Sequence, residues 1–193
     1  MNKNRLEAFS DGVLAIIITI MVLELKVPEG MDCNSLKPLL PKFLSYILSF
    51  IYVGIYWNNH HHMMHTVKHV NGKILWANLH LLFWLSLIPF TTAWIGDNHF
   101  ASFPMMMYGI VLLMNGLAYF ILQQFILKQQ GANSILKKAI GTDIKGKSSP
   151  VLYTLAVLLA NYYPILSGLI YIFVALMWLI PDKRIEKIFN END

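Results

Sequence analysis

The sequence predicts an all-α membrane protein with six transmembrane helices and cytoplasmic N and C termini. The first observation behind this prediction is composition: of 193 residues, 56% are hydrophobic and only 13% are charged, with a mean hydropathy of +0.51. Soluble domains carry about 25% charged residues. The second observation is a series of long apolar segments, and the third is an uneven distribution of basic residues between the loops.

Apolar segments long enough to cross a bilayer, about 17 to 25 residues, recur along the chain. The first four expected spans lie near 8–26, 42–59, 74–95 and 103–126. The segment from Pro150 to Ile180 is too long for one ordinary span, and the sequence NYYP at Asn161–Pro164 interrupts it. Because a proline disfavours helix at the residue before it, we expect two short helices, 149–162 and 164–180. Residues 1–193 are therefore expected to form a single six-helix transmembrane domain.

The basic residues predict the orientation of these spans. If both termini are cytoplasmic, twelve of the fifteen Lys and Arg residues lie on the inner side. These are Lys3, Arg5, Lys68, Lys73, Lys128, Lys137, Lys138, Lys145, Lys147, Lys183, Arg184 and Lys187, which leaves Lys26, Lys37 and Lys42 outside. Cytoplasmic loops of membrane proteins carry such an excess. We therefore expect a multi-pass protein of the cell (inner or plasma) membrane, surrounded by lipids.

The first span, FSDGVLAIIITIMVLEL at Phe9–Leu25, carries polar groups that a lipid-facing helix would exclude. Asp11 in lipid would cost several kcal/mol, so it should face protein or water and have a partner. Arg5, nearly two turns earlier, is a candidate partner through its long side chain. The alternative is that Ser10 and Asp11 only cap or flank the helix at its cytoplasmic mouth.

Further along this helix, Ile16, Thr19 and Leu23 are spaced by three and four residues and therefore share one face, with Ile20 beside Thr19. Two interpretations remain open from the spacing alone. These residues either pack against neighbouring helices, which is the commoner case, or line a path through the membrane.

Three segments resemble one known family. Arg5, Phe9, Ser10, Asp11 and Gly12 form the pattern R-x-x-x-F-S-D-G at the start of the first span. The segments WNNHH (Trp57–His61) and WANLHLLFWLSLIPFTT (Trp76–Thr92) follow at the end of the second span and in the third. Together with the six-span plan, they are similar to the transmembrane protein 175 family of lysosomal and bacterial potassium channels.

The resemblance implies a homotetramer whose central pore is lined by the first helix of each subunit. The chain has no TVGYG filter, so selectivity for permeant K⁺ over other monovalent cations must come from side chains. By the resemblance, Ile16 forms the narrow apolar constriction, Thr19 a hydroxyl layer near which K⁺ passes, and Leu23 a further hydrophobic ring beside Ile20. A ring of apolar side chains closes by dewetting, and hydroxyl oxygens replace part of a cation's hydration shell. No cofactor is expected.

The resemblance also implies a polar network that holds the first helix without touching the ion. Its expected members are Arg5, Phe9, Ser10, Asp11, Trp57, Asn58, His60, His61 and Asn78. Whether Asn58 or Asn59 takes part, and which histidines do, stays open.

The sequence HHHMMH at His60–His65, followed by His69, is the main rival feature. His61 and His65 lie at i and i+4 of a helix and suit a shared metal ion, which favours a proton-coupled or metal-ion transporter. The other interpretation is a juxtamembrane cluster that titrates or joins the polar network.

No enzyme is expected, because the chain lacks HExxH, a phosphate-binding glycine loop and paired intramembrane carboxylates. No nucleic-acid binding is expected either, because the positions of the basic residues in short loops fit membrane topology better.

Overall fold

The computed structural model describes residues 2–67, 69–131, 136–137 and 143–179, and every regular element within these ranges is helical. The elements are α1 (Lys3–Leu23), the 3₁₀ helix η1 (Cys33–Leu39), α2 (Leu40–His65), α3 (Gly72–Leu85), α4 (Ile88–Asp97), α5 (Ser102–Gln130), α7 (Ile144–Ala160) and α8 (Pro164–Leu179). The predicted all-α class is confirmed. The expected inner-side residues Lys68, Lys138, Lys183, Arg184 and Lys187 lie outside the described residues.

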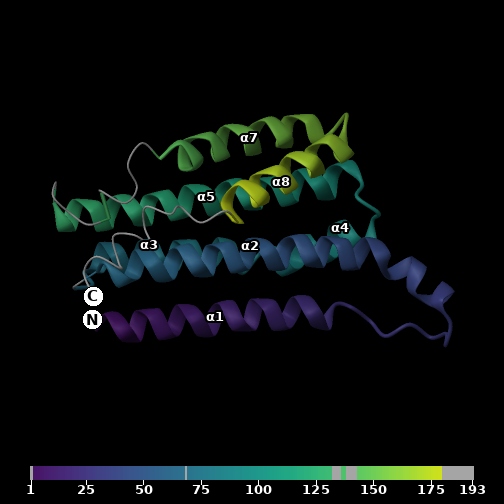
Figure 1. The fold of residues 1–193 in the computed structure, drawn as a ribbon, viewed down its shortest axis with the longest axis horizontal. Coiled ribbons are helices and arrows are strands. Elements are labelled where there is room, and N and C mark those ends of the chain that lie inside the picture. The colour runs from purple at the N-terminus through teal and green to yellow at the C-terminus, as the bar shows by residue number, and fades with distance from the viewer. Residues whose placement is uncertain (1, 68, 132–135, 138–142, 180–193) are drawn as a thin grey trace.

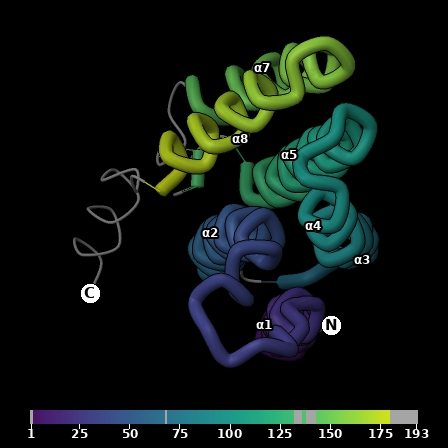
Figure 2. The backbone as a smooth tube through the Cα atoms, turned by 90° about the vertical axis from the view of Figure 1, so that its right-hand side faces the viewer, coloured from purple at the N-terminus to yellow at the C-terminus, as the bar shows by residue number. Residues whose placement is uncertain are grey.

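The long helices lie side by side along one axis (Figure 1). α1 forms one edge of the bundle and packs against α2, α3 and α4, whereas α7 and α8 form a hairpin at the opposite edge (Figure 2). α5 lies between these two edges, in contact with both α3 and α7. α1 is therefore covered on one side only, and its other side lies open in the single chain.

Among the residues that the structure describes, four helical stretches are long and apolar enough to cross a membrane: Lys3–Leu23, Cys33–His65, Gly72–Asp97 and Ser102–Gln130. α7 has 17 residues and the described part of α8 has 16, which at about 1.5 Å per residue makes each of these stretches shorter than a hydrocarbon core of roughly 30 Å. The structure thus supports a multi-pass membrane protein with four clear candidate spans and two shorter closing helices.

The segment expected as one span near 74–95 lies within the single apolar stretch Gly72–Asp97, in which a turn at Ser86 and Leu87, both with right-handed helical dihedral angles, separates α3 from α4. Pro89 lies in the first turn of α4, where its missing N–H is not needed. Asn115 of α5, fully buried, donates a hydrogen bond to the carbonyl of Trp84 at 3.4 Å. The same carbonyl also accepts the Leu87 N–H at 3.2 Å, so the side chain from the neighbouring helix adds a second hydrogen bond at the turn.

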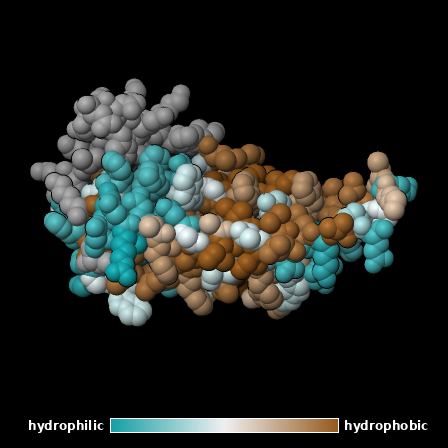
Figure 3. Space-filling model, turned by 90° about the horizontal axis from the view of Figure 1, so that it is seen from below, coloured by the Kyte–Doolittle hydropathy of each residue, from teal (hydrophilic) through white to brown (hydrophobic). Residues whose placement is uncertain are grey.

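Polar residues gather at the ends of the bundle and apolar residues form its middle (Figure 3). The larger hydrophilic group lies at the end where α1 begins and α2 ends. The described basic residues at this end are Lys3, Arg5, Lys73, Lys128, Lys137, Lys145 and Lys147. Those at the other end are Lys26, Lys37 and Lys42.

Candidate functional site

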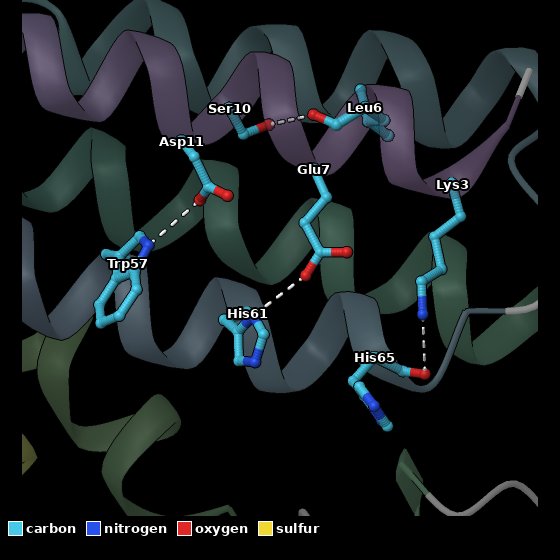
Figure 4. Close-up of polar contacts among 8 residues, drawn as sticks. All are labelled: Lys3, Leu6, Glu7, Ser10, Asp11, Trp57, His61 and His65. Atoms are coloured by element: carbon cyan, nitrogen blue, oxygen red, sulfur yellow. Dashed lines mark hydrogen bonds and ion pairs between the residues drawn. The ribbon is translucent and has the colours of Figure 1, made fainter.

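A ladder of three polar contacts joins α1 to α2 (Figure 4). The two helices run in opposite directions, so residues four apart on one meet residues four apart on the other. The contacts are Lys3 Nζ to the carbonyl of His65 at 3.5 Å, Glu7 Oε1 to His61 Nδ1 at 3.0 Å, and Trp57 Nε1 to Asp11 Oδ1 at 3.1 Å. We call this set the α1–α2 ladder.

A second set of hydrogen bonds lies inside the bundle and links three helices. His60 Nε2 donates to Asn78 Oδ1 at 2.7 Å, Asn78 Nδ2 donates to Ser10 Oγ at 2.9 Å, and Ser10 Oγ donates to the Leu6 carbonyl at 2.9 Å. All three side chains are buried. Because the Asn78 oxygen only accepts, the neutral His60 ring carries its proton on Nε2, and its Nδ1 has no hydrogen-bond partner among the described residues.

The structure thus brings together Ser10, His60 and Asn78, and separately Asp11 with Trp57 and His61 with Glu7. Arg5 and Asn58 have exposed side chains that bond to none of the described network residues, and Phe9 is 53% exposed. Asn59 donates to the Ile55 carbonyl of its own helix. The expected pairing of Asp11 with Arg5 is therefore replaced by a hydrogen bond from Trp57.

Glu7 is a ladder residue that the motif did not include. The signal that finds it is spacing: Lys3, Glu7 and Asp11 are four residues apart and share a stripe of α1. The carboxylate is only 18% exposed and pairs with a histidine ring that is half exposed.

The residues expected to line a pore lie on the uncovered side of α1. Ile16 is 60% exposed, Ile20 44% and Leu23 73%, whereas Leu14, Ile17 and Met21 on the opposite side are buried in the bundle. Thr19 lies on the exposed stripe, and its hydroxyl donates to the Ala15 carbonyl at 2.8 Å. That bond uses the hydroxyl proton, so the lone pairs of the oxygen stay available to an incoming cation.

The histidines of the second helix point in different directions. His60 faces Asn78 inside the bundle, whereas His61 faces Glu7 on α1. In the part of the chain that the structure describes, no three His, Cys, Asp or Glu side chains are grouped so that they could hold a metal ion.

Replacing Asn78 by leucine should destabilise the protein by about 1–3 kcal/mol, because the buried His60 Nε2 loses its acceptor and the buried Ser10 oxygen loses the N–H that donates to it. Leucine has the same branching and the same number of side-chain heavy atoms as asparagine, so the substitution leaves no cavity. The measurement is thermal unfolding of the purified protein in detergent. Asn58→Leu is the matched control, since this exposed amide should change stability by no more than about 0.5 kcal/mol. Equal losses in the two variants would contradict the assignment.

Comparison with known proteins identifies the family to which this chain is related. The family model described as "Endosomal/lysosomal potassium channel TMEM175" matches residues 5–89. A potassium channel of Chryseobacterium sp. (strain P1-3) is 62% identical over 192 residues, which is the full length of both chains. A potassium channel of Streptomyces collinus is 34% identical over 131 residues, 62% of each chain.

Two further matches extend the relationship. The human protein named endosomal/lysosomal proton channel TMEM175 is 35% identical over 96 residues, 43% of this chain and 19% of the human one. The crystal structure of a lysosomal potassium-selective channel TMEM175 homolog from Chamaesiphon minutus has a TM-score of 0.79 and 26% identity, covering 93% of this chain and 97% of that one. The resemblance seen in the sequence is confirmed, and the chain belongs to the TMEM175 family of ion channels.

Proposed function

We propose that four copies of this protein assemble around a central pore, lined by α1 of each copy, that conducts K⁺ passively and selectively. The observation that carries this proposal is the uncovered stripe of Ile16, Thr19, Ile20 and Leu23 on α1. A second support is that a relative that matches over its full length is named a potassium channel, a class of ion channel rather than enzyme. Four such stripes facing one axis would bury apolar surface and place a ring of hydroxyl oxygens within it.

The proposed pore works through two properties of that stripe. Four Ile16 side chains form a constriction that excludes water unless it widens, so an ion must shed much of its hydration shell there. Thr19 lies about one turn further along, and its four hydroxyl oxygens offer partial replacement of that shell. Leu23, with Ile20 beside Thr19, continues the apolar wall toward the outer end.

The distribution of charge supports the proposed orientation. Most described basic residues lie at the end where α1 begins, which would be the cytoplasmic end under the positive-inside rule. The α7–α8 hairpin would supply the fifth and sixth spans, with both termini inside the cell and the protein in the cell membrane. Glu24, directly after α1, would then lie near the outer mouth of the pore, where a carboxylate attracts cations.

We assign the polar contacts between α1 and its neighbouring helices to holding the pore helix in place. The Ser10–Asn78–His60 bonds fix α1 to α2 and α3, and the α1–α2 ladder fixes its rotation relative to α2. None of these side chains is part of the Ile16–Leu23 stripe, so we assign them to positioning α1 rather than to contact with the ion.

Flux from purified protein in liposomes tests the proposal. A K⁺ gradient should drive flux that far exceeds the flux under an equal Na⁺ gradient. Because animal relatives are named proton channels, the same liposomes carry an internal pH dye and are tested with a proton gradient. Proton flux without K⁺ flux would show that protons, rather than K⁺, are the permeant ion. The absence of any flux from folded, inserted protein would refute the channel assignment.

A further inference from the structure

A cavity of about 50 Å³ lies between α2, α5, α7 and α8. Its described lining includes Tyr56 of α2, Tyr119 and Gln123 of α5, and Asp143 at the start of α7. None of its described lining residues belongs to α1. The cavity is therefore separate from the stripe proposed to line the pore.

Two largely buried polar side chains line the cavity without a hydrogen bond to another described residue. Gln123 is only 8% exposed and Tyr56 only 9%, yet neither the Gln123 amide nor the Tyr56 hydroxyl forms a hydrogen bond with a described residue. Buried polar groups nearly always have a partner. A cavity needs roughly 10–15 Å³ to hold one water molecule, so this one has room for a ligand of a few heavy atoms.

The walls of the cavity favour a positive charge. Tyr56 and Tyr119 meet edge to face with ring centroids 6.2 Å apart, and Tyr153 adds a third ring. The Tyr119 hydroxyl donates to the Asn59 carbonyl at 3.3 Å, which fixes that ring. Asp143 contributes a carboxylate, and the described lining contains no lysine, arginine or histidine. Aromatic faces attract cations, and a carboxylate adds charge complementarity.

We propose that this cavity binds a small organic ammonium ion. The Asp143 carboxylate balances its charge, the side-chain oxygens of Gln123 and Tyr56 accept hydrogen bonds from its N–H groups, and the tyrosine rings surround its alkyl part. The site is independent of the proposed pore, so it stands whether or not α1 conducts K⁺.

Calorimetric titration of methylammonium chloride into the purified protein tests the site. A constant excess of KCl keeps other monovalent-cation sites occupied. We expect saturable binding that Asp143→Asn weakens at least about tenfold, a loss of about 1.4 kcal/mol. Asp97→Asn is the matched control, because that carboxylate pairs with Lys42 at the far end of the bundle and should leave affinity unchanged.

Asp143 also accepts a hydrogen bond from the Gly146 amide in the first turn of α7, so its variant carries some risk to folding. Gln123→Leu and Tyr56→Phe therefore provide a second pair of variants, each expected to weaken binding severalfold while the protein still unfolds cooperatively. Absence of saturable binding in the wild type would overturn the proposal. So would unchanged affinity in folded variants of the site, or equally tight binding of ethanol, a neutral molecule of similar size.

Discussion

Ile16→Asn is expected to raise K⁺ leak through the closed channel at least about tenfold, which requires the barrier to fall by only about 1.4 kcal/mol. Four asparagine side chains arranged around the pore can form hydrogen bonds with water. The constriction would therefore stay hydrated, whereas four isoleucine side chains exclude water. Ile16 is 60% exposed in the single chain, so the substitution removes little packing within the subunit. The measurement is K⁺ flux from liposomes, with the amount of inserted protein matched between samples.

The matched control for Ile16 is Ile165→Asn. Ile165 is 76% exposed on α8, at the edge of the bundle opposite α1. It should face lipid, so this variant should leave the leak at the wild-type level provided that the protein inserts. Unchanged leak in Ile16→Asn would remove this residue from the gate.

Thr19→Ala should lower selectivity for K⁺ over Na⁺. The substitution removes the oxygens that replace water around the ion, and a hydrogen bond or contact to a charged group is worth about 1.5–3 kcal/mol. Only the part of that energy that differs between the two cations affects selectivity, so we expect the permeability ratio to fall severalfold. Reversal potentials in planar bilayers with K⁺ on one side and Na⁺ on the other provide the measurement.

Two variants serve as controls for Thr19. Thr19→Ser keeps the hydroxyl and should keep most of the selectivity. Thr154 on α7 is also exposed, and its hydroxyl donates to the Pro150 carbonyl at 2.8 Å, just as Thr19 donates to Ala15. Thr154→Ala should therefore change local helix geometry in the same way without changing the permeability ratio. Equal effects of Thr19→Ala and Thr154→Ala would contradict a role in selectivity.

Much of the helical architecture follows from features visible in the sequence. Long apolar runs predict helices because each span must satisfy its own backbone hydrogen bonds in lipid, and NYYP marks the turn that separates α7 from α8. The interruption between α3 and α4 was harder to predict. Pro89 alone fits a simple kink, and the hydrogen bond that Asn115 makes beside the turn comes from a distant part of the chain.

In the candidate site too, some features follow from the local sequence, whereas others depend on contacts between distant parts of the chain. The spacing of Ile16, Thr19 and Leu23 places them on one face of any helix, and the structure leaves that face uncovered. The choice of Trp57 as partner of Asp11 could not be read from local spacing, because it depends on how α1 and α2 align in opposite directions. The cavity beside Gln123 is also long-range, since its walls come from four helices. The roles of the predicted pore and network residues stay predictions.

The central claim, that α1 lines the pore, is tested most directly by chemical modification of Leu23. Cys33 is exposed and is first replaced by serine, after which Leu23→Cys and Leu158→Cys are compared. Both leucines are highly exposed in the single chain, 73% and 68%, and both lie near the ends of their helices. A membrane-impermeant cationic thiol reagent should block K⁺ current through Leu23→Cys and leave Leu158→Cys unaffected. Current through Leu23→Cys that persists under the reagent, with modification of the cysteine shown by mass spectrometry, would contradict a pore lined by α1.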